Sequence, residues 1–495
     1  MSAPAGQRTA APAAVRTSPL VVLVHTITFR QARRFAGSFL PLAALIGIRG
    51  GSATAVLVIG AVAVFSLVTA VLSWWRFSYA DGAASVVVTR GLLSRSVRTV
   101  PNDRVRGVEI ETPALHRVFG LVRVRIDAAA GAMKDDEEEL VVDGVTRAEG
   151  DRLRVSVLTH RSGADTAGDD GVPGAPVEEE FTRFDNRWLL YAPLVGSYLA
   201  LPLAVAGALY RAVDDLPDSV LPALPGPDLA HPGVLALLAG IAVVLLLLGS
   251  VVGAALVNWG FRLVRRGGSL ISVRGLITRR HTELEIDRIR GATVSAGLGM
   301  RLVRAARVNA LMTGLGDAGR RGQLLPLGPS SEAWRLARRL VEDPGPLVAH
   351  PPAARRRRLG RALFPGLAVT AGGIVVALAV GWWELLAVGV VLLAAGVPLG
   401  LGRYAALGHA TGPRSFAVRS GFLLEEQAIL QRRAVVGWRV RQTFFQRRAG
   451  LATVVACVGA GSGGYAAVDL GAADVAAFAA AASEPWSETL SPRVP

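Results

Sequence analysis

The sequence predicts a membrane protein of mixed α and β structure: six transmembrane helices in three hairpins, each followed by a small β-sandwich or open barrel that a C-terminal helix closes. Three observations predict this fold class. The 495-residue chain has a mean hydropathy of +0.42 and only 19% charged residues, against roughly 25% in soluble proteins. Its uncharged apolar runs come in pairs. A stretch with strand-like periodicity follows each pair.

The composition also limits the class of protein. The apolar content is too high for a disordered chain. A net charge of +16 on so apolar a sequence indicates a membrane protein with basic cytoplasmic parts. The single cysteine, Cys457, excludes an intrachain disulfide framework and a multi-cysteine metal site. Residues 1–34 are expected to be a disordered, basic segment without a cleavable signal peptide.

Six apolar runs contain no charged residue, and a helix needs about 20 such residues to cross a bilayer core. The runs are Phe35–Ile48 and Ala53–Trp75, Trp188–Tyr210 and Gly233–Val257, and Ala362–Val380 and Leu385–Gly402. They predict transmembrane hairpins over residues 35–75, 188–257 and 362–402. The first run is short and spans only if Arg49 extends to the interface. Within the runs, Gly249 with Gly253 and Gly396 with Gly400 have the spacing that lets helices pack closely.

The arginines predict the orientation of these spans. The basic flanks Arg30–Arg34, Arg262–Arg266 and Arg355–Arg358 all lie on one side of a three-hairpin protein. The longest turn on the other side, residues 211–232, has one arginine and four aspartates. Because basic residues favour the cytoplasmic side, we expect a multi-pass protein of the plasma membrane with both termini in the cytoplasm.

The three soluble stretches, 76–161, 261–345 and 403–484, resemble one another and are called the first, second and third repeat below. Each begins with a strand, a glycine turn and a strand: Val88–Arg95, Ser272–Arg279 and Val418–Leu424. Gly91 and Gly275 are 184 positions apart, as are Arg104 and Arg288. Gly91 and Gly421 are 330 apart, as are Gly120 and Gly450. Such constant spacing indicates an internal repeat. Each repeat ends in a helix-like segment: Arg147–Leu158, Ser331–Glu342 and Ala472–Ala482.

These blocks resemble a known family. Hairpins followed by units with Arg90-Gly91-Leu92-Leu93, Asp103–Val108 and Phe119-Gly120-Leu121 are similar to bacterial pleckstrin-homology (bPH2) domain membrane proteins of the YdbT-like type, from residue 35 to about 484. The resemblance implies PH-like domains, each a seven-stranded sheet bent into a partly open barrel with a C-terminal capping helix. It implies no catalytic residues. It also implies a link to envelope stress or antimicrobial-peptide resistance. The remaining segments are a linker (162–187), a polybasic linker (346–361) and a tail (485–495).

Other motifs favour no enzymatic chemistry. Gly459–Gly464 fits a dinucleotide-binding pattern, but Tyr465–Leu470 after it is typical of a strand, so we expect a hairpin turn. The acidic runs Asp135–Glu139 and Glu178–Glu180 lack the spaced ligands of a calcium site. The seven histidines are scattered. We therefore expect no catalytic residues, no cofactor and no metal.

The candidate binding residues are Arg355, Arg356, Arg357 and Arg358, directly before the third hairpin. A cytoplasmic basic run beside a span attracts anionic lipid by about 1 kcal/mol per charge. The equally strong alternative is that the run only fixes topology. Nucleic acid is not an expected partner, because few aromatic residues alternate with the arginines.

The sequence thus predicts a non-enzymatic, polytopic membrane protein that displays three cytoplasmic PH-like modules as a scaffold. The modules would bind a membrane or cytoplasmic protein, or lipid head groups, through sheet edges or grooves. The alternative hypothesis is a transporter or exporter of amphipathic compounds or peptides. The charge-free spans argue against ion-coupled transport.

Overall fold

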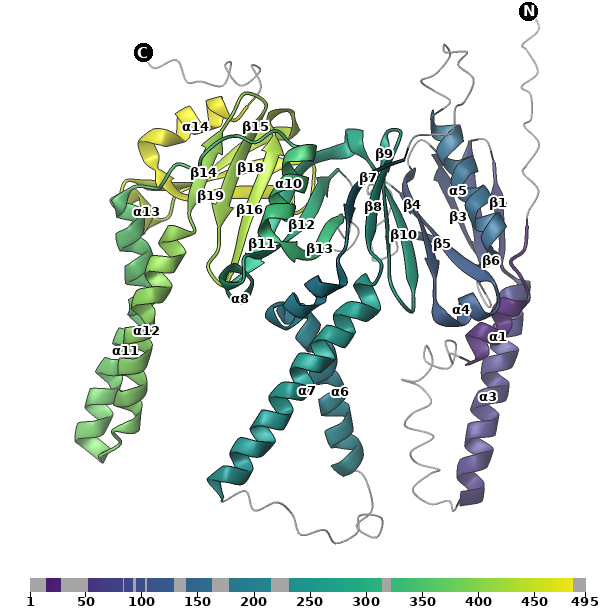
Figure 1. The fold of residues 1–495 in the computed structure, drawn as a ribbon, viewed down its shortest axis with the longest axis horizontal. Coiled ribbons are helices and arrows are strands. Elements are labelled where there is room, and N and C mark those ends of the chain that lie inside the picture. The colour runs from purple at the N-terminus through teal and green to yellow at the C-terminus, as the bar shows by residue number, and fades with distance from the viewer. Residues whose placement is uncertain are drawn as a thin grey trace, which may run out of the picture. The chain divides into compact units, whose positions relative to one another are not determined.

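The computed structural model describes residues 15–27, 52–82, 84–91, 95–102, 105–128, 139–162, 178–214, 231–313 and 322–483. The chain divides into two units by its internal contacts. The first unit is Met1–Glu178 with Ile271–Leu284, and the second is Glu179–Leu270 with Glu285–Pro495. Figure 1 shows the elements of both.

The first unit contains the first repeat. Its elements are α1 (Leu20–Ile27), α3 (Ser52–Trp75), β1 (Ser78–Asp81), β2 (Ser85–Arg90), β3 (Ser96–Pro101), β4 (Val105–Thr112), α4 (Ala114–Val118), β5 (Leu121–Ala128), β6 (Glu139–Thr146) and α5 (Arg147–Ser162), with β9 (Ser269–Arg274) and β10 (Arg279–Glu285). One sheet has the order β1-β2-β3, and another includes β6-β5-β4-β10-β9. The apolar core lies between these strands and α5, around Val86, Val124 and Leu153.

The second unit contains most of the second repeat and the whole third repeat. Its elements begin with β7 (Glu178–Arg183), the 3-10 helix η2 (Asn186–Leu194), α6 (Gly196–Asp214), α7 (Pro232–Asn258), β8 (Arg262–Arg266), η3 (Ile286–Arg288), β11 (Ile289–Gly297), α8 (Leu298–Leu302), β12 (Ala305–Met312), β13 (Gln323–Pro329) and α10 (Ser330–Leu340). They continue with α11 (Pro352–Val380), α12 (Glu384–Ala405), β14 (Gly408–Thr411), β15 (Ser415–Ser420), β16 (Leu424–Gln431), η4 (Arg432–Ala434), β17 (Val435–Arg441), α13 (Phe444–Arg448), β18 (Leu451–Val458), β19 (Gly464–Gly471), η5 (Ala472–Asp474) and α14 (Val475–Ala481).

Strands of consecutive repeats pair with each other. In the first unit β4 of the first repeat pairs antiparallel with β10 of the second. In the second unit β11 of the second repeat pairs antiparallel with β16 of the third, within a sheet of order β13-β12-β11-β16-β15-β14. The sequence interpretation treated each repeat as a separate β-sandwich or barrel. Its strand periodicity could not show that an edge of one repeat is completed by the next.

The glycine spacing corresponds to a repeated backbone conformation. Gly91, Gly275 and Gly421 all have positive φ, at 132°, 108° and 99°. A Cβ at Gly275 or Gly421 would clash with the carbonyl oxygen three residues later, so the predicted glycine turn requires glycine. Each repeat also has a β-bulge at the same place, for example between Val105 and Gly107 of β4.

The prediction of six transmembrane helices in three hairpins is not supported. Three helices in the described part of the chain are long and apolar enough to cross a membrane: α7, α11 and α12. A fourth span results only if η2 and α6, which are bent by 75° relative to each other, count as one. The run Phe35–Ile48 lies outside the described residues. The run Ala53–Trp75 forms most of α3.

The expected span Trp188–Tyr210 is not one continuous helix, because it breaks at Val195 between η2 and α6. Leu189 and Ala192 of η2 are buried, and Trp188 packs edge-on against Phe184 with ring centroids 5.3 Å apart. Val195 has extended backbone angles that end η2 before α6 begins. The break at Val195 therefore sets η2 at 75° to the apolar helix that follows.

The predicted third hairpin is present, with glycines at its interface. Figure 1 shows α11 and α12 side by side. Gly381, at φ 78°, ends α11. An added Cβ at any of five glycines would lie within 3 Å of the facing helix: Gly366, Gly373, Gly389, Gly396 and Gly400. The predicted close packing at Gly396 and Gly400 is thus confirmed, because small residues let helix backbones approach.

Three expected irregular segments are partly ordered. Residues 1–34 include α1, whose Val21 and Val24 are buried against Leu121, so the expected disorder is wrong for this helix. The linker 162–187 contains β7 and the start of η2. The polybasic linker 346–361 is helical from Pro352 onward, because proline fits the first turn of a helix. The tail 485–495 lies outside the described residues.

Arg304 has the same left-handed backbone conformation as the equivalent glycines of the other two repeats. It has a φ of 53°, while Gly120 and Gly450, at the equivalent positions of the other repeats, both have 66°. A left-handed conformation costs a residue with a side chain about 1–2 kcal/mol. We therefore expect Arg304→Gly to stabilise the protein by about 1 kcal/mol, measured by thermal unfolding of the detergent-solubilised chain.

The matched control for this prediction is Gly450→Ala. A Cβ at Gly450 meets no atom within 4 Å, so only backbone strain should act. It should destabilise by about as much as Arg304→Gly stabilises. A glycine at residue 304 that leaves the melting temperature unchanged or lower would contradict the shared conformation.

Candidate site at the base of the third repeat

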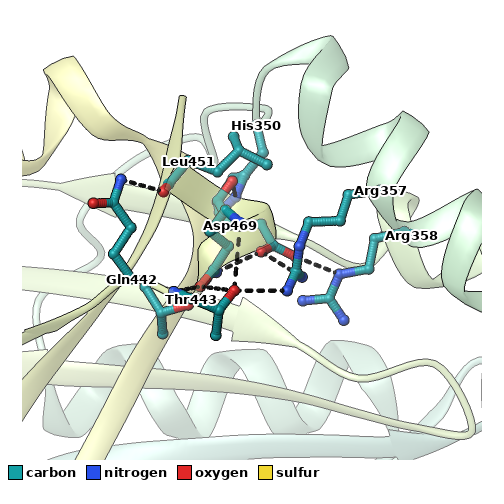
Figure 2. A network of polar contacts seen from close by, with 9 residues as sticks. His350, Arg357, Arg358, Gln442, Thr443, Leu451 and Asp469 are labelled. Carbon is teal, nitrogen blue, oxygen red and sulfur yellow. Dashed lines mark hydrogen bonds and ion pairs between the residues drawn. The ribbon is translucent and has the colours of Figure 1, made fainter. Parts of the chain in front are cut away.

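A buried carboxylate connects three elements of the third repeat and its hairpin: β19, α11 and α13. The side chain of Asp469, on β19, is 0% exposed. The Arg357 Nη1 atom lies 2.9 Å from its Oδ1, and the Arg358 Nε atom lies 2.7 Å from its Oδ2. Gln446 of α13 donates from Nε2 to Oδ1 at 2.8 Å. Figure 2 shows the two guanidinium groups converging on the carboxylate.

Local hydrogen bonds hold these groups in place. Thr443 and Gln446 form a capping box at the start of α13. The Nη2 atom of Arg357 donates to Thr443 Oγ1 at 3.5 Å. The Nδ1 atom of His350 lies 3.2 Å from the Asp469 carbonyl oxygen, and Tyr404 of α12 donates to the His350 carbonyl at 2.8 Å. The start of α11 is therefore tied to β19, α12 and α13 together.

His350 is neutral in this setting. Burial lowers the pKa of its imidazole from 6.5 to about 4, and the nearby His409 contributes to the decrease. The two rings meet edge-on with centroids 5.1 Å apart. An uncharged ring next to two arginines adds no further positive charge to the site.

The four predicted lipid-contact arginines divide into two pairs. Arg355 and Arg356 are exposed on the first turns of α11. The side chains of Arg357 and Arg358 are only 14% and 17% exposed, because they turn toward Asp469. The structure brings Arg357 and Arg358 together on Asp469 and leaves Arg355 and Arg356 exposed.

The first repeat has a related anchor. Asp143 of β6 accepts a hydrogen bond from His116 of α4 at 2.8 Å, and its Oδ2 lies 3.1 Å from His25 of α1 and 3.0 Å from Arg123. Burial raises the pKa of Asp143, but the hydrogen bonds from His116 and His25 and the charge of Arg123 outweigh burial and hold it well below its usual value. His116 and Gln446 are 330 positions apart, so the same position of the short helix contacts the carboxylate in both repeats.

The sequence interpretation missed the exposed aromatic residues of α13. Phe444 and Phe445 are 68% and 71% exposed, and Arg447 and Arg448 follow them. The short helices of the other repeats likewise expose Val118 and Leu302. A signal existed, because two adjacent phenylalanines before two arginines are conspicuous in a chain with only 6% aromatic residues.

The other sequence motifs form turns and strands. Gly459–Gly464 lies in the turn between β18 and β19, which pair antiparallel from Cys457 and Gly464 onward, so the predicted hairpin turn is confirmed. The residues Glu178–Glu180 begin β7. Over the described ranges no three His, Cys, Asp or Glu side chains are placed to hold a metal ion. The acidic run Asp135–Glu139 falls almost wholly outside those ranges.

Comparison with known proteins agrees with this architecture. The family model described as "Bacterial PH domain" matches residues 35–160, 205–343 and 362–484, most of the chain. The chain belongs to the bacterial PH domain family. Within that family, it is 20% identical over 270 residues to the UPF0699 transmembrane protein YdbT of Bacillus subtilis (strain 168), covering 52% of this chain and 54% of that protein. It thus spans about half the length of this relative. No solved structure matches the chain.

The buried carboxylate of this bacterial PH protein can be tested by neutralisation. Asp469→Asn keeps a residue that tolerates the positive φ of 62° but leaves the largely buried Arg357 and Arg358 without their counter-charge. We expect a loss of about 3 kcal/mol in the free energy of unfolding, measured by chemical denaturation in detergent.

The control for that substitution is Asp343→Asn. Asp343 pairs with Arg338 at 3.4 Å, but both side chains are about half exposed. An exposed pair contributes less than about 1 kcal/mol, so this variant should be nearly neutral. Equal effects of the two substitutions would show that the Asp469 network carries no special stability.

Proposed function

We propose that this chain is a non-enzymatic, multi-pass protein of the plasma membrane. Its repeats, residues 76–161, 261–345 and 403–484, would be PH-like modules on the cytoplasmic side that bind protein partners or anionic lipid head groups. The family match and the similarity to a transmembrane protein support membrane association. A role in envelope stress or antimicrobial-peptide resistance is part of the same proposal.

Four exposed side chains near the start of α11 carry the proposal: Arg355 and Arg356 of α11, and Phe444 and Phe445 of α13. Arg355 and Arg356 are exposed near the N-terminus of a helix long enough to span a membrane. Arg357 connects that helix to Thr443, the N-cap of α13, whose two phenylalanines are exposed. Charged and aromatic side chains next to a span are suited to the head-group region.

The fixed position of α13 supports this interpretation. The Asp469 network holds α13 against the first turns of α11, so Phe444 and Phe445 stay close to where α11 would enter the bilayer. Aromatic rings at the membrane interface contact both acyl chains and head groups. The exposed guanidinium groups add attraction to phosphate.

Lipid binding is tested with the full chain in nanodiscs of phosphatidylcholine with or without 30% phosphatidylglycerol as the probe lipid, a mole fraction of about one in three that gives a strongly anionic surface. We expect Arg355→Gln/Arg356→Gln to reduce enrichment of phosphatidylglycerol around the protein by roughly tenfold or more, since each charge contributes about 1 kcal/mol. Enrichment is measured by native mass spectrometry of the extracted complex.

A matched variant controls for net charge. Arg335→Gln/Arg338→Gln removes two exposed arginines from α10, the closing helix of the second repeat. It should leave lipid enrichment unchanged. If both double variants lose enrichment equally, the lipid responds to overall charge and the assignment to Arg355 and Arg356 is wrong.

The proposed orientation has its own test. An alkaline phosphatase fusion within residues 215–230 should be active, because that turn would lie outside the cytoplasm. A fusion at residue 170 should be inactive, and green fluorescent protein at the same two places should give the opposite pattern. Activity at 170 together with inactivity within 215–230 would invert the topology.

A further inference from the structure

Among the described strands, β17 is an edge strand, although its counterparts in the other repeats are not. It lies at one edge of the sheet β17-β18-β19. The equivalent strands β4 and β11 are covered by β10 and β16, the third strand of the following repeat. No strand of the described residues covers β17 in the same way.

The two internal pairings share one register. Glu111 of β4 faces Arg280, and Ser295 of β11 faces Glu426. Residue 295 of the second repeat is equivalent to residue 111 of the first, 184 positions earlier. The third repeat follows the second by 146 positions, the difference between the spacings of 330 and 184, so residue 426 is equivalent to residue 280. The fourth strand of a repeat therefore accepts a strand in a fixed way, which the equivalent residues of β17 can reproduce.

The pairing surface of β17 is exposed where its counterparts are buried. Val440 is 54% exposed, while Ile110 and Val294 at the equivalent positions are 5% and 6% exposed. Arg439 and Arg441 are also exposed. An exposed apolar residue on an unpaired edge is a site for addition of another strand.

The charges on β17 define the strand that would fit. Arg439 and Arg441 occupy the positions of Glu109 and Glu111 in the first repeat. There, Glu111 lies 3.2 Å from Arg280 of the covering strand. On β18 the residues opposite the two arginines are Val455 and Thr453, which supply no counter-charge.

We propose that β17 binds an extended acidic strand of a partner protein. The strand pairs antiparallel in the register of the internal junctions and places carboxylates opposite Arg439 and Arg441. This inference deepens the proposed function, on which it rests, by naming the kind of protein partner that the third repeat accepts. Main-chain hydrogen bonds supply affinity, and the two ion pairs supply selectivity.

A second copy of this chain fits less well. The strand that it would contribute by analogy is β3, the third strand of the first repeat, which lies at the edge of its own sheet. In the shared register Arg98 of β3 would face Arg439. Like charges directly opposite each other oppose strand pairing.

The test uses the full chain in nanodiscs and a synthetic peptide with the sequence of residues 422–433 carrying Ala428→Glu. In the proposed register its residue 426 faces Arg441 and its residue 428 faces Arg439. We expect saturable binding by fluorescence anisotropy. The variant Arg439→Glu/Arg441→Glu should weaken binding about tenfold. A peptide with lysine at positions 426 and 428 should bind the reversed variant and not the natural chain.

Two further arms test strand pairing itself. A peptide with N-methylated amides along its pairing edge keeps the charges but cannot form the ladder, so it should lose binding. In a Cys457→Ser background, Val440→Cys should form a disulfide with a peptide carrying cysteine at position 427, which faces it, and not with one carrying cysteine at position 430.

Several outcomes would overturn the proposal. These are unchanged binding of the N-methylated peptide, indifference to Arg439→Glu/Arg441→Glu, or no binding at all. Disulfide-linked oligomers from a mixture of Val97→Cys and Val440→Cys chains would assign the edge to a second copy. The lipid measurement on Arg355→Gln/Arg356→Gln is independent of β17, so failure of one proposal is distinguishable from failure of the other.

Discussion

The hydrogen bonding of strand edges is the constraint on which the rest of this structure depends. An uncovered edge leaves a row of backbone donors and acceptors unpaired. The chain meets this requirement by laying the third strand of one repeat against the fourth strand of the repeat before it, as β10 on β4 and β16 on β11. Ile110 and Val294 are buried because their strands are covered, and the equivalent Val440 is exposed on β17.

Buried carboxylates on strands of the first and third repeats fix the positions of the neighbouring helices. Asp469 binds Arg357, Arg358 and Gln446, and Asp143 binds His116 and His25. A buried charge is tolerated only with partners of opposite charge and good geometry, so each anchor fixes several elements together. The same network turns two arginines of α11 inward and leaves their two neighbours outward. One basic run thereby serves both anchoring and the proposed lipid contact.

Glycines at the helix interface determine how closely the apolar helices pack. Gly373 and Gly389 of α11 and α12 leave room for the facing backbone, which packs the third hairpin without large side chains between its helices. The second pair differs, because Trp188 packs on Phe184, Leu189 is buried, and α6 starts only after the bend at Val195. Hydropathy alone does not distinguish a run that packs on protein from one that faces lipid.

The sequence by itself determined the repeat, its glycine turns and closing helices, and most of the apolar runs. These features are local: a positive φ at Gly275, a strand period of two and a helix period of 3.6 are each visible within a few residues. Only the tertiary structure decided how β11 meets β16, or that Arg357 and Arg358 face Asp469, more than 100 positions away. Such contacts join distant segments, and a one-dimensional pattern records neither which edge is left uncovered nor which side chain turns inward.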